Sequence, residues 1–152
     1  MRPLPVYEHP AIFDEAISTA TQRLLIVSPW IRRAVVDDAF LRNVQRACER
    51  GVQVSIGFGL GEEDAGEKPW DAEARQKLEK LAKELPLLDV RRLGNTHAKV
   101  LVKDSDFFVI TSFNWLSFRG DPSKAFREEW GTIVRDPPLV DDFYAEIIQR
   151  FA

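Results

Sequence analysis

The chain has 152 residues, 45% of them hydrophobic and 30% charged, and this composition is typical of a globular protein with one core. No stretch approaches the roughly 20 apolar residues of a membrane span, and Met1–Pro10 lacks the basic-then-apolar order of a secretory signal, so we expect a cytoplasmic protein. The net charge of −3 argues against nucleic-acid binding over the whole surface, but seven Arg and Lys against three Asp between Arg91 and Arg127 indicate a localised anion site, with ordinary charge scatter as the alternative.

The first part of the chain predicts helices alternating with strands. Pro10–Ala20 has the apolar spacing of an amphipathic helix, and Leu24–Ser28 is a short apolar run typical of a buried strand. Asp37–Arg50 follows helical spacing and is stopped by Gly51, and Gln53–Phe58 is the next strand. A strand, a helix and a strand in this order favour a parallel pair joined by a crossover helix.

The second part adds further elements of both kinds. Gly59–Trp70 reads as an exposed loop, Ala72–Leu85 as a charged helix and Leu88–Arg92 as a short strand. Trp130–Val134 is a further strand, and Leu139–Phe151 is a closing helix after two prolines. The sequence therefore predicts an α/β fold with a mixed central sheet and helices on both faces.

A hairpin carries the most informative pattern. His97–Lys103 and Phe107–Ser112 read as strands joined by a turn at Asp104-Ser105-Asp106. His97 and Lys99 lie two residues apart, and so do Ser112 and Asn114, so each pair shares a face of its strand. The hairpin should place residue 97 roughly opposite 114 and residue 99 roughly opposite 112, so that four polar groups form one patch.

These residue types suit attack on a phosphodiester, which needs a nucleophile and donors for the phosphoryl oxygens. His97 supplies an imidazole that is nucleophilic near neutral pH, Lys99 supplies positive charge, and Ser112 and Asn114 supply neutral donors. Since these groups already stabilise the charge, we expect no metal and no other cofactor. His9, the other histidine, is distant in sequence and belongs to no cluster at ligand spacing.

The stretch HAKVLVKDSDFFVITSFN resembles the HKD signature of the phospholipase D superfamily, H-x-K-x4-D-x6-G-S-x-N, and departs from it only at Thr111, where the family usually has Gly. The resemblance implies that His97 forms a phosphohistidine and that Asp104 has a structural role, capping backbone amides. Family members also orient the histidine with a carboxylate, often in an E-x-G pattern. Glu129 fits that pattern, and the neighbouring Glu128 is the alternative, because alternation lets only one of them face inward.

The order of elements also resembles one half of a phospholipase D fold, so residues 1–152 are expected to form a single phospholipase D-like domain. Phospholipase D chemistry uses two HKD motifs across one site, and this chain has one. His9 lies outside any such motif and is expected to be a surface or capping residue. The resemblance therefore implies a two-fold homodimer with the active site at the interface, as in small single-motif endonucleases of the family.

Several other residues are candidates for substrate binding, because aromatic side chains can stack on bases and Arg or Lys can hold phosphates. Packing in the core or at its rim is the alternative for the tryptophans, and solvated loop charge is the alternative for the cations. The candidates are Trp30, Arg32, Trp115, Arg119, Lys124 and Arg127.

Three functions remain open at this point. The basic segment and the single motif favour a nuclease that acts on DNA or RNA. A phospholipase or phosphatidyl transferase is the second possibility, although no exposed apolar loop with basic flanks indicates membrane contact. A non-catalytic nucleic-acid-binding or dimerisation module is the third. The chain could also be a nuclease domain of a larger protein, in which other domains or subunits bind the nucleic acid.

Overall fold

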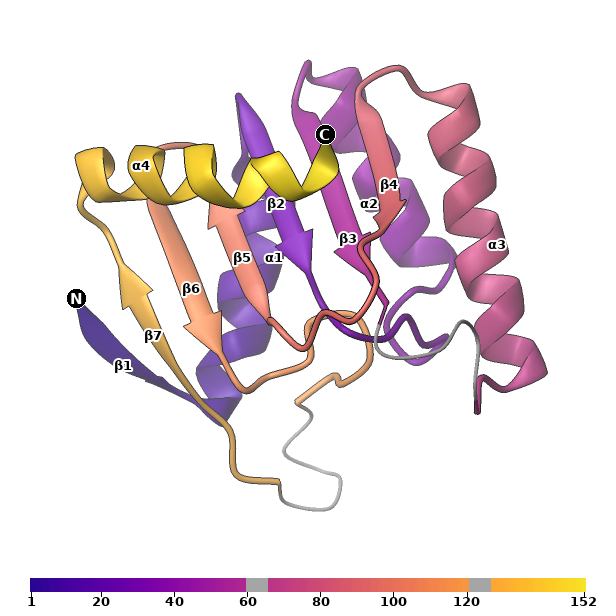
Figure 1. Ribbon diagram of the computed structural model, residues 1–152, viewed down its shortest axis with the longest axis horizontal. Coiled ribbons are helices and arrows are strands. Elements are labelled where there is room, and N and C mark those ends of the chain that lie inside the picture. Colours follow the sequence, from indigo (N-terminus) through magenta and orange to yellow (C-terminus); the bar gives the residue numbers. More distant parts are fainter. Residues whose placement is uncertain (60–65, 121–126) are drawn as a thin grey trace.

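The computed structural model describes residues 1–59, 66–120 and 127–152, which form a seven-stranded mixed sheet with helices on both faces (Figure 1). The strands are β1 (Arg2–Pro5), β2 (Arg23–Val27), β3 (Gln53–Phe58), β4 (Leu88–Arg92), β5 (Val100–Lys103), β6 (Phe107–Thr111) and β7 (Trp130–Val134). The α-helices are α1 (His9–Thr19), α2 (Asp38–Glu49), α3 (Pro69–Glu84) and α4 (Pro137–Ile147), with 3-10 helices η1 (Val6–Glu8) and η2 (Ile148–Phe151). The strand order is β1-β7-β6-β5-β2-β3-β4.

The parallel half of the sheet contains β2, β3 and β4, which confirms the predicted parallel pair and its crossover helix. The side chain of Asp37 accepts a hydrogen bond from the Phe40 backbone N–H at 2.9 Å and so begins α2. Gly51 ends the helical segment with a φ of 88°, a conformation that glycine adopts without a steric penalty.

The antiparallel half contains β5, β6, β7 and β1, and β5 joins the two halves by pairing antiparallel with β2. Because β5, β6 and β7 run antiparallel to one another, the start of β5, the end of β6 and the start of β7 lie at one edge of the sheet. The carboxyl ends of β2, β3 and β4 lie at the same edge (Figure 1). Loops that follow or precede these strand ends are therefore brought together.

Helices α1, α2 and α3 cover one face, and α4 covers the other, as expected from the sequence (Figure 1). The larger core includes Ile12 and Phe13 of α1, Val44 of α2 and Leu78 of α3. The smaller core lies beneath α4, where Val140 packs with Val102 and other β-branched residues of the central strands. Both faces are thus buried at the centre of the sheet, which explains the near-continuous apolar runs of β2 and β3.

Three elements begin two or more residues away from their predicted starts. β5 begins at Val100 instead of residue 97, so the His97–Lys99 segment precedes the strand. α3 begins at Pro69, inside the predicted loop, whose residues 60–65 lie outside the described ranges. Pro137 and Pro138 are the first residues of α4 instead of breakers before it, because a proline at the first helical turn loses no hydrogen bond.

Candidate active site

The sequence-predicted catalytic residues lie together at the edge described above. His97 and Lys99 precede β5, Ser112 and Asn114 follow β6, and Glu129 precedes β7. The hairpin was predicted correctly, but its register differs by one residue. Val100 pairs with Ile110, and the Thr111 backbone N–H donates to the Lys99 carbonyl at 3.2 Å, so residue 99 lies opposite 111 instead of 112. The patch forms nonetheless, because its residues lie in the segments just beyond the paired strands.

His97 and Lys99 form a close pair. The Lys99 Nζ lies 3.3 Å from both ring nitrogens of His97 and donates to the His97 carbonyl at 2.9 Å. The imidazole is exposed, while Lys99 is buried. Burial lowers the pKa of Lys99, opposed by the nearby Glu129 carboxylate and assisted by Arg127. An imidazole open to solvent therefore lies beside a partly desolvated ammonium group.

Ser112, Glu129 and Arg127 form the second part of the site. The Ser112 hydroxyl donates to Glu129 Oε2 in a short hydrogen bond, and the Trp130 backbone N–H donates to Ser112 Oγ at 3.2 Å. Arg127 Nε lies 2.7 Å from Glu129 Oε1. Glu129 is buried and Glu128 is exposed, so the prediction that only one of them faces inward is confirmed.

Glu129 is thus held by Ser112 and Arg127 within one chain. Over the described ranges, no hydrogen bond or ion pair joins its carboxylate to His97. Its charge acts on Lys99, whose pKa it raises against the effect of burial. The orienting role toward the nucleophile stays a prediction, and the contacts place Glu129 as the group that fixes Ser112 and balances the cations.

Asn114 is buried, and its backbone carbonyl accepts hydrogen bonds from Ser117 and Phe118 at 3.2 and 3.0 Å. These bonds fix the turn that carries the amide. Its Oδ1 has no hydrogen-bond partner among the described residues. An unpaired buried acceptor costs about 1–3 kcal/mol. The amide is therefore held by its backbone, with side-chain hydrogen-bonding capacity left over.

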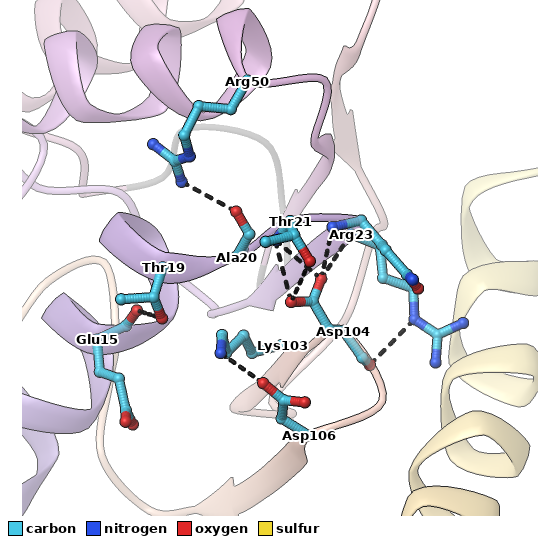
Figure 2. Close-up of polar contacts among 10 residues, drawn as sticks. Glu15, Thr19, Ala20, Thr21, Arg23, Arg50, Lys103, Asp104 and Asp106 are labelled. Carbon is cyan, nitrogen blue, oxygen red and sulfur yellow. Dashed lines mark hydrogen bonds and ion pairs between the residues drawn. The ribbon is translucent and has the colours of Figure 1, made fainter.

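Asp104 lies at the opposite edge, in the hairpin turn (Figure 2). Its carboxylate accepts hydrogen bonds from the backbone N–H groups of Thr21, Gln22 and Arg23 at 3.0, 2.7 and 2.9 Å. Burial raises the pKa of Asp104, but these three bonds outweigh burial and hold the pKa below its ordinary value. The residue therefore ties the hairpin to the start of β2, as its expected structural role requires, and lies away from the polar patch.

His9 is fully buried, so the surface alternative was wrong, but the capping alternative is confirmed, because His9 is the C-cap residue of η1. Its Nδ1 lies 2.9 Å from the Pro5 carbonyl, and its Nε2 lies 2.7 Å from Thr111 Oγ1. Since Nδ1–H donates to the carbonyl, Nε2 accepts from the threonine hydroxyl, which in turn accepts from the Phe113 N–H at 3.0 Å. The ring also stacks on Phe113, with centroids 4.5 Å apart.

This network links His9 to the motif and explains how the fold accommodates Thr111 at the position where the family usually has Gly. Gly131 lies opposite Thr111 across β6 and β7, and a Cβ there would come within 2.7 Å of the threonine Cβ. The missing side chain at residue 131 therefore leaves room for the one at 111. The departure from Gly in the motif was the signal that could have indicated a partner for this hydroxyl, although its identity needed the fold.

The structure places the candidates for substrate binding in different surroundings. Trp115 is fully buried and stacks on Phe13, so core packing is correct and substrate contact is wrong for this residue. Lys124 lies outside the described residues. Arg119 is exposed and pairs with Asp37 at 2.8 Å. The remaining candidates, Trp30, Arg32 and Arg127, are exposed at the same edge as the polar patch.

Two further observations concern the described part of the chain as a whole. None of its helices is long and apolar enough to cross a membrane. It contains no group of three or more His, Cys, Asp or Glu residues arranged to hold a metal ion. The charged side chains described in and beside the polar patch include Lys99, Arg127 and Glu129.

A fold of this topology with an HKD-type patch at one sheet edge defines a phospholipase D-like protein. The family model described as "Cardiolipin synthase, PLD-like domain" matches residues 13–151. The chain belongs to this family and thus to the phospholipase D-like phosphodiesterase superfamily. No curated protein matches the chain in sequence.

Solved structures share the fold. Nuc from Salmonella typhimurium, a phospholipase D family member, matches with a TM-score of 0.64 and 19% identity over 92% of this chain and 84% of that one. NucT from Helicobacter pylori matches with a TM-score of 0.64 and 14% identity over 98% and 95%. Phosphatidylserine synthase from Haemophilus influenzae Rd KW20 matches with a TM-score of 0.71 and 16% identity over 97% of this chain and 35% of that one.

Proposed function

We propose that the protein is a metal-independent phosphodiesterase, an endonuclease that cleaves DNA or RNA through a phosphohistidine at a homodimer interface. One observation carries the proposal: the exposed His97 imidazole stands 3.3 Å from the Lys99 Nζ, in a patch that also contains Ser112 and Asn114. A nucleophile beside a desolvated cation and neutral donors suits attack at phosphorus.

The proposed reaction uses two histidines, namely His97 from each of the two chains of the dimer. The His97 imidazole nitrogen attacks phosphorus, the bond from phosphorus to the leaving oxygen breaks, and the second imidazolium gives that oxygen its proton. The second histidine, now neutral, takes a proton from water as the water oxygen attacks the phosphohistidine. The phosphorus–nitrogen bond then breaks, which releases a phosphomonoester and restores both histidines. Lys99 and Asn114 stabilise the charge on the phosphoryl oxygens throughout.

Nucleic acid is favoured as the substrate by the surroundings of the patch. Arg127 and Arg119 flank it with exposed guanidinium groups, and Trp30 and Arg32 lie at the same edge. The fold likeness to Nuc and NucT supports the same choice. A DNA-binding archaeal chromatin protein, TrmBL2, also shares the fold, with a TM-score of 0.64 at 16% identity over 98% of this chain and 52% of that one.

A phosphatidyl transferase or phospholipase is the second candidate, because the matching family model is described as a cardiolipin synthase domain. A nuclease domain that works within a larger protein is a variant of the first candidate. Each candidate would use the same patch, so only a test with both lipid and nucleic acid as substrates distinguishes them.

The test is incubation of the purified chain with single- and double-stranded DNA and RNA in excess EDTA, followed by gel analysis. A parallel incubation uses phosphatidylglycerol vesicles, with thin-layer analysis of the lipids. We expect cleavage of nucleic acid in EDTA and none by His97→Ala or His97→Asn. Cleavage by a well-folded His97→Ala protein, or activity that needs added Mg²⁺, would contradict the mechanism, and turnover of lipid alone would establish the second candidate.

A further inference from the structure

We propose that Trp30, Arg32, Arg33 and Trp70 form a binding surface for single-stranded nucleic acid beside the polar patch, named here the Trp–Arg surface. The inference deepens the proposed function by naming unpaired strands as the preferred substrate. It rests on that function only for the cleavage step, because binding is measured separately. Arg33 and Trp70 belong to no motif and lie outside the HKD pattern.

The surface consists of two tryptophan–arginine pairs. Trp30 is 38% exposed and Trp70 is 47% exposed, which is unusual for large indoles. The Arg32 guanidinium lies 5.6 Å from the centroid of Trp30, and the Arg33 guanidinium lies 5.8 Å from the centroid of Trp70. Each guanidinium therefore lies over one face of an indole that is still partly exposed.

Hydrogen bonds join this surface to both segments that carry the predicted catalytic residues. The Arg32 backbone N–H donates to the Leu116 carbonyl at 2.9 Å, two residues past Asn114. On the other side, the Gly59 N–H donates to the Pro29 carbonyl at 2.9 Å, and the Thr96 N–H donates to the Gly59 carbonyl at 2.8 Å. Thr96 precedes His97 directly, so the loop after β2 is held next to the patch from both sides.

Asp71 fixes the two pairs relative to each other. It is 4% exposed, accepts a hydrogen bond from the Arg33 backbone N–H at 2.8 Å, and lies 3.7 Å from an Arg32 guanidinium nitrogen. The aspartate belongs to the first turn of α3, next to Trp70. One buried carboxylate thus docks the loop onto the helix, and this reduces the entropy that a ligand must remove on binding.

The chemistry of the surface suits unpaired bases. A base can stack on an indole only when it is free of its own partner strand, and a guanidinium beside each indole can contact the adjoining phosphate. Among the described acidic residues near the surface, Asp37 pairs with Arg119 and Asp71 with Arg32, while Asp38 and Glu73 share Lys77 at 3.7 and 3.5 Å. Stacking also suits a chain whose net charge is −3, because it needs little electrostatic attraction.

A lipid surface fits less well. Membrane-binding loops combine tryptophan with exposed aliphatic side chains. Ile31, the aliphatic residue between Trp30 and Arg32, is 4% exposed and packs into the core. Of the other aliphatic residues in this loop, Ala34 is exposed but small, and Val35 is half-buried against the core, so the large exposed side chains are Trp30 and the two arginines.

The first experiment measures binding in the His97→Ala chain, which leaves the nucleic acid uncut. Fluorescence anisotropy with labelled oligo-dT, the same strand in a duplex, and phosphatidylglycerol vesicles gives the three affinities. We expect oligo-dT to bind most tightly and Trp30→Ala with Trp70→Ala to weaken it about tenfold or more, since stacking contributes on the order of one decade per base. The matched control is Arg135→Ala, an exposed arginine 5.0 Å from the Phe107 ring at the opposite edge.

The second experiment compares two substrates in the chain with His97 intact. The ratio of kcat/KM for an oligonucleotide to that for bis(p-nitrophenyl) phosphate should fall about tenfold in the Trp30→Ala, Trp70→Ala protein and stay constant in Arg135→Ala. Unchanged oligo-dT affinity, equal loss for duplex and single strand, or binding to vesicles alone overturns the Trp–Arg surface. Absence of all cleavage alongside the predicted loss of oligo-dT binding would overturn the proposed function and leave the surface intact.

Discussion

The surroundings of the His9 imidazole hold it in its neutral form. Burial lowers its pKa below the ordinary value of 6.5, and this effect exceeds the opposing influence of the Pro5 and Val6 carbonyls. The unfolded chain therefore takes up a proton at a higher pH than the folded chain does. Stability contributed by the neutral ring is complete above pH 6.5 and declines as the pH falls toward the pKa of the folded state.

Substitution of His9 tests this pH dependence. His9→Gln keeps an acceptor within reach of Thr111 and removes the titrating group. We expect the free energy of unfolding of the unchanged chain to fall between pH 7 and pH 5, and that of His9→Gln to change less over the same range. Urea unfolding at several pH values measures both curves. Parallel curves for the two proteins would mean that His9 is not the source of the pH dependence.

Glu129 is the residue whose charge matters most to the cations of the site. Glu129→Gln keeps the size of the side chain but removes the negative charge that faces Lys99 and Arg127. We expect kcat to fall on the order of 100-fold, because the ammonium and Ser112 lose their alignment. Glu128→Gln, exposed and one residue away, is the control and should change kcat less than threefold. A reversed ranking would transfer the role to Glu128.

The residues of the polar patch could be predicted because their chemistry depends on spacing along the chain. His9 and Trp115 could not, since their positions depend on packing between α1 and the segment after β6. A tryptophan next to a motif suits either substrate stacking or the core, and sequence alone does not reveal which neighbours cover it. Burial is a property of the assembled fold, and it overturned the surface alternative for His9 and the substrate-contact alternative for Trp115.

At the scale of elements, the β5–β6 hairpin depends on Asp104. Asp104→Ala would leave three part-buried backbone N–H groups without their acceptor, and the φ of 48° at residue 104 is a conformation that Ala disfavours. We expect a loss of about 3 kcal/mol in the free energy of unfolding. Asp106→Ala, in the same turn but exposed, should cost less than about 1 kcal/mol.

Denaturant unfolding of both variants measures the difference, and the activity of the folded fraction adds a second readout. Because Asp104 lies at the edge opposite the patch, kcat for correctly folded Asp104→Ala should stay near that of the unchanged chain at low temperature. Equal stability of Asp104→Ala and Asp106→Ala would remove the structural role. Loss of kcat in a fully folded Asp104→Ala protein would instead give it a part in the reaction.

The same turn explains the register error. Asp104 adopts the left-handed backbone conformation, and the turn connects the strands through three residues. Lys103 therefore pairs with Phe107, and this first pair sets the register of the whole hairpin. Side-chain patterns identified both strands but not the turn geometry that sets their register. β1 was missed for a related reason. Arg2–Pro5 contains two prolines, which suit an edge strand paired on one side, and only the fold shows that β7 is beside it.

At the scale of the molecule, the proposed reaction needs two histidines at one phosphorus atom, and only His97 of this chain lies in the polar patch. The sequence contains two histidines, and His9 is fully buried and hydrogen-bonded through both ring nitrogens. His9 cannot reach a leaving oxygen without dismantling the network around Thr111. The structure thus strengthens the argument that the sequence made for a second copy of the chain.

The surface beside the patch carries exposed apolar side chains of the kind found at protein–protein interfaces. Ile110 is 49% exposed and Trp130 is 54% exposed. Ile110 pairs with Thr132, and Trp130 lies two residues before Thr132, so the two side chains share one face of the sheet. Burial of these apolar groups against a symmetric copy would favour association and bring the two polar patches together.

The homodimer can be tested by mixing. We expect the protein to sediment as a dimer, and phosphate or sulfate to stabilise it by relieving repulsion between the two Lys99 groups. If both copies of His97 act at one phosphorus, a heterodimer with one His97→Ala chain turns over little or nothing. After random exchange with an equal amount of His97→Ala, activity per unchanged chain should therefore fall to about half. In the control, the protein is mixed with an equal amount of the same unchanged protein, and the activity per chain should stay constant. A monomer with full activity, or a mixture that keeps full activity after proven exchange, would require a second acid within the chain.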